Sequence, residues 1–422
     1  MEIQIKPPIH VANCQIRCFF LAILYCALPL VARVELGIDR FFAEGYAEQI
    51  KGKRVALVVN HTSVDASLKK TEELFYEHAG VYQLVALFTP EHGLDGQAYA
   101  EEHVPHKKTL HNLPVYSLHG DVRRPTDAML KGIDCIIYDL QDIGVRSYTY
   151  ASTLFYIMEE SAKRGIQVMV LDRPNPIGGQ LVDGPMLENK FRSFIGYLHV
   201  PYCHGMTIGE LARFFNAEYH IDCRLSVISM RGWKRSMAFE DTGLAWIPSS
   251  PNIPEADTPL FYASTGILAC LCVVNTGVGF TLPYKIVGAP WIDAERFSSR
   301  LNAQKLPGVY FVPFHFRPFY GSLKGKDCHG VKIVVTDRTR YLPLTVQYIL
   351  IGMIKSLYPK AFKEHIQRLK PEARELFCKA NGNEKMWEWL QQEDYVAWKF
   401  VGYQQKEREE FLVRRLPYLL YN

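Results

Sequence analysis

Four apolar runs of strand length constrain the fold of this chain more than any other feature of its sequence. They occupy residues 54–60, 82–88, 134–140 and 167–173. Each run is aliphatic almost throughout instead of alternating between apolar and polar residues, which is typical of strands covered on both faces of a parallel sheet. Helix-like segments separate the runs and close on a glycine. Strands that alternate with helices in this way predict a Rossmann-like parallel α/β sheet.

Residues 247–259 mark a change along the chain, because four of these thirteen residues are prolines. Proline is disfavoured in helix interiors and central strands, so this segment predicts an ordered crossing or a domain boundary. We expect a Rossmann-like domain at residues 34–261, followed by a smaller α/β domain at residues 262–422. The second domain should contain a helix that begins after Asp293, strands at residues 308–314 and 330–337, and a long helix at residues 345–358.

The first 33 residues have the pattern of a secretory leader. Lys6 and Arg17 precede an apolar run at residues 18–32. This run is shorter than the roughly 20 residues that span a bilayer, and Pro29 interrupts it. The pattern favours a cleaved signal peptide at residues 1–33, and therefore export to the periplasm or cell envelope without a stable membrane span after cleavage. An uncleaved hydrophobic arm and a misassigned start codon are the alternatives.

The charge of the chain argues against a nucleic-acid partner. The formal net charge is +4, and both signs are spread along the sequence without long basic runs, whereas nucleic-acid binding depends on concentrated positive charge. The ten cysteines form no CxxC pair, so we expect neither a zinc framework nor an obligatory disulfide. Cys135 should be buried in its strand, and Cys270 and Cys272 should alternate along another strand.

Polar residues follow all four apolar runs. The carboxyl ends of parallel strands meet at one edge of a sheet, where ligands bind in folds of this class. The strand-end groups are Asn60, His61, Thr62 and Ser63; Glu91, His92 and Gly93; Asp139, Gln141 and Asp142 with Arg146; and Asp172, Arg173 and Asn175. Each taken singly could merely cap a helix or hold a turn. For Asp139 and Arg173 we favour a structural ion pair.

The motifs that are missing narrow the chemistry of this edge. No GxGxxG or GK[ST] loop follows the first run. The sequence therefore has no glycine-rich loop that could bind the phosphates of a nucleotide at this position. There is also no GxSxG elbow for a nucleophilic serine. His61, His92 and His204 could gather around a metal with Asp142, but no close ligand spacing supports such a site. We expect neither a cofactor nor a metal, and keep a metal-dependent hydrolase as an alternative.

Carboxylates, arginines and amides without a metal or nucleophile motif suit polar-ligand recognition with acid/base catalysis, and sugars are ligands of that kind. Glycoside hydrolysis needs an acid near the leaving oxygen and usually a second carboxylate. Glu91 can be the acid if its loop folds inward. Asp142 is a candidate for the second carboxylate, and an acetamido group on the substrate could replace it as internal nucleophile.

Several motifs in order resemble the exo-acting β-N-acetylmuramidases, a bacterial peptidoglycan-recycling family. They are TPEHG (89–93), YDLQDIGVRSYTY (138–150), LDRPNPIGG (171–179), HGMTIGELA (204–212), PSSPNIP (248–254), GAPW (288–291) and CHGVKIVVTD (328–337). The resemblance implies a Rossmann-like domain, a smaller α/β domain and a site in the cleft between them. It also implies release of terminal N-acetylmuramic acid from the non-reducing end of peptidoglycan fragments, with Glu91 matching the proposed catalytic glutamate.

The same resemblance makes seven further residues candidates for holding the substrate. They are Asn60, His92, Asp142, Arg146, Arg173, Asn175 and His204. Arg146 or Arg173 is the natural partner of the lactyl carboxylate of muramic acid, because a guanidinium can donate two parallel hydrogen bonds. The expected partners are therefore peptidoglycan-derived saccharides or muropeptides.

One loop departs from the family pattern. At residues 275–280, where the family's glycine-rich loop should carry an arginine and a threonine that contact substrate, this chain has Val278 and Phe280 among its residues. We expect the loop to form one wall of the cleft. The alternative function is therefore a catalytically weakened muropeptide- or sugar-binding protein of the same fold.

Overall fold

The computed structural model describes residues 33–98, 107–108 and 112–422. The predicted leader, apart from Arg33, lies outside the described residues. Within the described part of the chain, no helix has the length and apolar character needed to cross a bilayer.

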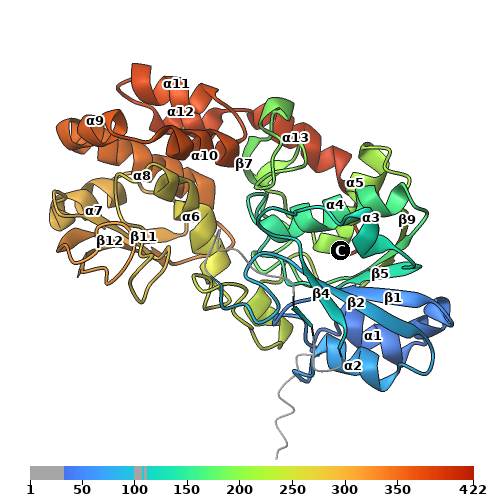
Figure 1. The fold of residues 1–422 in the computed structure, drawn as a ribbon. Coiled ribbons are helices and arrows are strands. Elements are labelled where there is room, and N and C mark those ends of the chain that lie inside the picture. Colours follow the sequence, from blue (N-terminus) through green and yellow to red (C-terminus); the bar gives the residue numbers. More distant parts are fainter. Residues whose placement is uncertain (1–32, 99–106, 109–111) are drawn as a thin grey trace, which may run out of the picture. The chain divides into compact units, whose positions relative to one another are not determined.

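The first part of the chain builds a seven-stranded sheet with strand order β3-β4-β2-β1-β5-β6-β9 (Figure 1). Six of these strands are parallel, and β3 runs antiparallel to β4. The strands are β1 (Arg54–Val58), β2 (Gln83–Thr89), β3 (Lys107–Lys108), β4 (Pro114–Ser117), β5 (Cys135–Tyr138), β6 (Gln167–Leu171) and β9 (Arg224–Ile228). The four predicted strands are β1, β2, β5 and β6, and the predicted Rossmann-like parallel sheet is confirmed. Chain order reverses between β1 and β5, which is where open sheets of this order bind ligands.

Helices cover both faces of this sheet, as Figure 1 shows for α1 and α2 on one side and α4 and α5 on the other. They are α1 (Gly37–Ala43), α2 (Thr71–Glu77), α3 (Asp127–Leu130), α4 (Thr149–Ala162) and α5 (Ile208–Glu218). Alternate residues of a strand point to opposite faces. Val55 of β1 accordingly packs in one core cluster with Phe75 of α2. Ala56 packs in the other with Leu154 of α4 and Phe215 of α5.

Local signals set several helix boundaries. The Thr207 hydroxyl accepts from the Glu210 backbone N–H at 3.2 Å, and the Glu210 carboxylate accepts from the Thr207 N–H at 3.0 Å, so the predicted capping box opens α5. Helix α2 begins only at Thr71. The Asp65 carboxylate accepts from the backbone N–H groups of Ser67 and Lys69, both at 2.8 Å, which holds residues 65–70 in turns and delays the helix.

The second part of the chain combines a three-stranded antiparallel sheet, of order β10-β12-β11, with helices. Its strands are β10 (Ile286–Ala289), β11 (Val309–Phe316) and β12 (Cys328–Val335). Its helices are α6 (Thr258–Cys270), α7 (Ala294–Asn302), α8 (Pro343–Leu357), α9 (Pro359–Gln367), α10 (Pro371–Asn381), α11 (Lys385–Gln392), α12 (Ala397–Gly402) and α13 (Gln405–Arg414). The expected smaller α/β domain is thereby confirmed, including the N-cap Asp293 of α7 and the long helix α8.

Of two expectations about the chain around residues 258–272, one is wrong and the other stays a prediction. Cys270 ends helix α6, and Cys272 follows in a turn with φ 52°, so the predicted strand at these cysteines is wrong. A short apolar run does not distinguish a strand from the buried end of a helix. The predicted boundary between residues 261 and 262 stays a prediction and falls inside α6.

Two further segments connect the first part of the chain to the second. One is a two-stranded antiparallel ladder of β7 (Asp183–Met186) with β8 (Pro201–Cys203). The Asp183 carboxylate of β7 accepts from the Leu344 N–H of α8 at 3.0 Å. The last residues of the chain return to the first sheet. The Tyr421 hydroxyl donates to the Asp172 carboxylate at 2.5 Å, and the Arg235 N–H donates to the Asn422 carbonyl at 2.9 Å. Asp172, a strand-end residue of β6, is therefore used to anchor this segment.

Candidate active site

Glu91 lies in a cavity of about 280 Å³ at the carboxyl edge of the first sheet. The wall comes from the loops after β2 and β4, from the start of α4, from the segment between β7 and β8, from the proline-rich crossing and from the second part of the chain. The lining residues are Glu91, His92, His119, Arg123, Ser147, Tyr148, Thr149, Phe194, Ile195, Ser250, Asn252, Ile253, Tyr262, Tyr284 and Leu376. A cavity of this size and mixed polarity can hold a small polar ligand such as one sugar ring.

Two described side chains, Thr149 and His119, lie next to the Glu91 carboxylate. Its Oε2 accepts a hydrogen bond of 2.8 Å from the Thr149 hydroxyl, and its Oε1 lies 3.8 Å from Nε2 of His119. Thr149 is the first residue of α4, so the carboxylate also lies near the positive end of a helix dipole. Only 9% of Glu91 is exposed, and that exposed fraction borders the cavity.

The turn that carries Glu91 has an unusual backbone. The Gly93 N–H donates to the Pro90 carbonyl at 3.1 Å, and His92 has a φ of 71°. A non-glycine residue in this region costs about 1 kcal/mol or more and persists where surrounding contacts enforce it. Nδ1 of the His92 ring lies 2.7 Å from the Ala98 carbonyl oxygen. This strained turn directs Glu91 and His92 toward the cavity.

His119 was missed in the sequence, although its position follows the same rule as the others. It comes two residues after β4 and is 5% exposed. Strand β4 has only four residues, so it did not stand out among the long apolar runs. A histidine directly behind the short apolar run at residues 114–118 was the signal that could have found it.

Tyrosine hydroxyls form much of the remaining wall. Tyr148 donates to the Ser249 hydroxyl at 3.0 Å, and the Tyr262 hydroxyl lies 3.3 Å from that of Ser147. Burial raises the pKa of Tyr262 to about 12 and that of Tyr148 further. These phenols therefore stay neutral and are suited to hydrogen bonding with a polar ligand.

Of the eight predicted site residues, Glu91 and His92 line this cavity, and the other six lie outside its lining. Asn60 donates to the Tyr150 hydroxyl at 3.0 Å and accepts from the Thr62 N–H and hydroxyl. Asn175 donates to the Met206 carbonyl at 3.0 Å and accepts from the Ile177 N–H. Both side chains organise loops behind the cavity.

The two arginines expected to hold a carboxylate are both engaged by the protein. Arg146 donates to the carbonyls of Pro185, Val200 and Ala380 at 2.6–2.9 Å, and burial lowers its pKa to about 10. Arg173 donates to both carboxylate oxygens of Asp139, at 2.5 and 2.8 Å. The predicted structural pairing of Asp139 with Arg173 is therefore confirmed.

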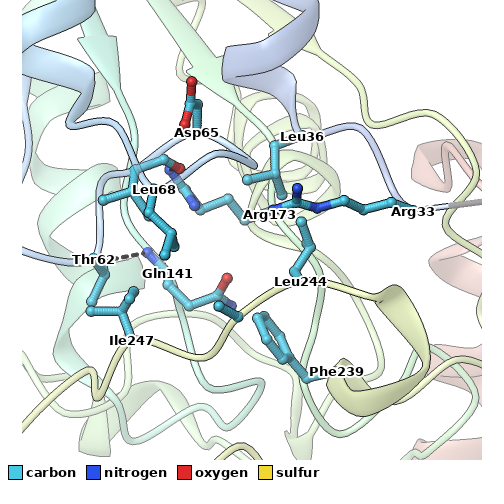
Figure 2. A pocket seen from close by; sticks show the side chains of 12 residues that line it. Arg33, Leu36, Thr62, Asp65, Leu68, Gln141, Arg173, Phe239, Leu244 and Ile247 are labelled. Carbon is cyan, nitrogen blue, oxygen red and sulfur yellow. Dashed lines mark hydrogen bonds between the residues drawn. The ribbon is translucent and has the colours of Figure 1, made fainter.

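Arg173 borders a different, much smaller cavity (Figure 2). Gln141, Phe239 and Leu244 also line this small cavity. The backbone N–H of Gln141 donates to the Thr62 hydroxyl at 3.2 Å. Its volume is about 20 Å³, which is room for about one water molecule and not for a sugar.

Asp142 and His204 are both buried, and neither lines the cavity. The Oδ1 of Asp142 accepts from the Gly144 N–H at 2.7 Å, and its Oδ2 has no hydrogen-bond partner among the described residues. Burial raises the pKa of Asp142 to about 7. Burial lowers the pKa of His204 to about 3, with Arg415 nearby adding to the effect. Within the described residues, no three histidine, cysteine, aspartate or glutamate side chains gather as metal ligands.

The sequence matches two family models that together cover most of the chain. They describe the N-terminal domain of the exo-β-N-acetylmuramidase NamZ, over residues 55–257, and its C-terminal domain, over residues 260–421. The chain belongs to the NamZ family of exo-β-N-acetylmuramidases. The resemblance in the motifs is therefore confirmed, and the chain is a glycosidase.

Individual proteins with similar sequences and folds were also found. The chain is 42% identical over 334 residues to the peptidoglycan β-N-acetylmuramidase NamZ of Bacillus subtilis, a match that covers 78% of this chain and 80% of that protein. Two crystal structures of DUF1343 family proteins from Bacteroides fragilis each match 92% of this chain and 99% of their own. Their TM-scores are 0.86 and 0.69, at 37% and 26% identity.

Phe280, in the loop that departs from the NamZ pattern, packs against the second sheet. Phe280 lies against Phe314 and Phe316 of β11, with ring centroids 6.3 and 5.6 Å apart. Neither Val278 nor Phe280 is among the lining residues, whereas Tyr284, which follows the loop, is. Phe280 is half-buried by apolar contacts with the second sheet. The expectation that the loop at residues 275–280 forms one wall of the cleft stays a prediction.

Proposed function

We propose that this glycosidase releases terminal N-acetylmuramic acid from the non-reducing end of peptidoglycan fragments, with Glu91 as general acid/base. One observation carries the proposal. Among the described residues that line the cavity, Glu91 is the one carboxylate, and Thr149 orients it. The activity named for the Bacillus subtilis relative supports the choice of substrate.

The chemistry follows from this single carboxylate. Glu91 donates a proton to the glycosidic oxygen as the bond to the anomeric carbon breaks. Retaining and inverting enzymes with two carboxylates need the second at about 5 Å or at roughly 6.5–9.5 Å, and Asp142 lies outside the cavity lining. We therefore propose that the carbonyl oxygen of the substrate's acetamido group attacks the anomeric carbon. The Glu91 carboxylate then takes a proton from the water that opens the resulting ring.

Hydrolysis of a chromogenic N-acetylmuramic acid β-glycoside tests the role of Glu91. Glu91→Gln should lower kcat by about 10³-fold, because general acid catalysis contributes about 10²–10⁴. Glu295→Gln, at an exposed position of α7, is the matched control and should keep full activity. Saturable binding without turnover by the wild-type protein would contradict the enzymatic proposal, and full activity of the Gln variant would contradict the role of Glu91 alone.

A second measurement tests the acetamido step. Its participation predicts that the first product keeps the β configuration, which proton NMR detects before the sugar mutarotates. It also predicts a steep loss of kcat when the acetyl group is replaced by trifluoroacetyl, because fluorine withdraws electron density from the attacking oxygen. An initial α product would rule out this route and favour direct attack by water.

A further inference from the structure

Arg123 is the arginine at the cavity that the protein itself leaves available. It lies six residues after β4, lines the cavity and is exposed. Among the described residues it makes no hydrogen bond or ion pair. Arg146 and Arg173 differ in this respect. Three backbone carbonyls accept hydrogen bonds from Arg146, and the Asp139 carboxylate accepts two from Arg173.

The position of the Arg123 guanidinium is set by an aromatic ring. Its Cζ lies 4.6 Å from the ring centroid of Phe194, which is 6% exposed. A cation over an aromatic face is attracted by the negative charge of the ring's π-electrons. This contact uses the face of the guanidinium and leaves the N–H groups at its edge available as donors.

Phe194 also connects Arg123 to the carboxylate site. The ring centroids of Phe194 and His119 are 6.3 Å apart, and His119 in turn lies 3.8 Å from the Glu91 carboxylate. All four side chains line one cavity. A sugar ring whose glycosidic oxygen is near Glu91 can therefore direct a substituent elsewhere on the ring toward Arg123.

We propose that Arg123 binds the carboxylate of the lactyl ether on muramic acid, and so makes the enzyme prefer N-acetylmuramic acid to N-acetylglucosamine. This inference rests on the proposed function, which supplies the sugar at Glu91. A carboxylate matches the geometry of a guanidinium edge, with two parallel N–H donors. N-acetylglucosamine lacks the lactyl group and cannot make this contact.

A carboxylate at this position can come from two sources. In an unsubstituted sugar it is the lactyl carboxylate, whereas in a muropeptide that group is an amide and the charge lies on the stem peptide. We assign Arg123 to the lactyl carboxylate, because it borders the same cavity as Glu91. Four β-glycosides separate the sources: N-acetylglucosamine, N-acetylmuramic acid, its lactyl amide and its peptide-linked form.

The full-length chain with Arg123→Gln tests the inference on these four glycosides. The variant should lower kcat/KM for the N-acetylmuramic acid glycoside by about ten- to a hundredfold, mainly through KM, since a hydrogen bond to a charged group is worth about 1.5–3 kcal/mol. Its kcat/KM for the N-acetylglucosamine and lactyl amide glycosides should stay within about twofold of wild type. Arg123→Lys should retain part of the preference, and Arg300→Gln, at an exposed position of α7, should match wild type.

Other outcomes would overturn the assignment. An equal loss on all four glycosides would mean that Arg123 supports the cavity rather than recognising a carboxylate. A loss confined to the peptide-linked glycoside would move the contact to the stem peptide. If the wild-type protein hydrolyses none of them, the proposed function fails. Calorimetric binding of free N-acetylmuramic acid and N-acetylglucosamine then still tests Arg123, because equal affinities in wild type and Arg123→Gln would refute it.

Discussion

Replacing Asp142 by asparagine should change the pH dependence of stability in a defined way. This carboxyl group is buried, and its pKa is raised from the ordinary 3.8 to about 7 because burial disfavours the charged form. The folded protein therefore holds a proton at Asp142 that the unfolded chain releases above pH 4. The free energy of unfolding should fall as pH rises from about 4 to about 7, and the loss is complete once the pH passes the folded pKa.

The magnitude follows from the two pKa values. They differ by roughly three pH units, and each unit corresponds to about 1.36 kcal/mol, which gives about 4 kcal/mol as the upper limit for this one group. Asparagine has no proton to release. Its amide also keeps an oxygen that can accept from the Gly144 N–H, as Asp142 Oδ1 does at 2.7 Å. Any cost of the unused amide donors is the same at every pH.

Urea unfolding of wild type and Asp142→Asn at pH 4, 5, 6, 7 and 8 measures the effect. The variant should gain stability relative to wild type as pH rises, by several kcal/mol between pH 4 and 7, and should keep kcat within about threefold of wild type. Parallel stability curves would refute the account of the buried carboxyl. A loss of kcat comparable to that of Glu91→Gln would refute the view that Asp142 acts outside the reaction.

Three further outcomes are expected. Thr149→Val should lower kcat about tenfold in the chromogenic assay, because it removes the 2.8 Å hydrogen bond that orients Glu91. Thr149→Ser keeps the hydroxyl group, so its kcat should stay near that of wild type. Equal losses of kcat in both variants would contradict this explanation. Arg173→Met should lower the free energy of unfolding, measured in urea, by about 3–5 kcal/mol, because it leaves Asp139 charged and buried without its partner. The double variant with Asp139→Asn should recover part of that stability. If it recovers none, loss of the ion pair is not the cause. Prolonged treatment with EDTA should leave the hydrolysis rate unchanged, and a loss that zinc restores would favour the metal-dependent alternative.

The sequence indicates the edge that carries the candidate site, because parallel strands place their carboxyl ends together. It does not show which polar residues at that edge point into the cavity. Arg146 illustrates the limit, since one of its partners, the Ala380 carbonyl, lies 234 residues away in the sequence. Contacts of that range depend on how the second part of the chain packs, and no local pattern reports them.

The residues that the sequence did not reveal share a short element. His119 and Arg123 both follow β4, whose four residues (Pro114–Ser117) carry little hydrophobic signal. Hydrophobic periodicity is recognisable only over a sufficient length of chain. The seven residues of β2 therefore mark the polar residues that follow them as a strand end, whereas the four residues of β4 do not. Phe280 departs from the family motif, and its side chain packs against Phe314 and Phe316 and is not among the residues that line the cavity.

The return of the final segment to the first sheet has a thermodynamic consequence for ligand binding. Arg415 donates to the carbonyls of Gly179, His204 and Gly205, so the two sheet-bearing parts are joined there as well as through the crossing at residues 247–259. Rotation about one connection would strain the other. Ligand binding to the cavity should therefore order little of the protein, and the loss of conformational entropy on binding should fall mainly on the ligand.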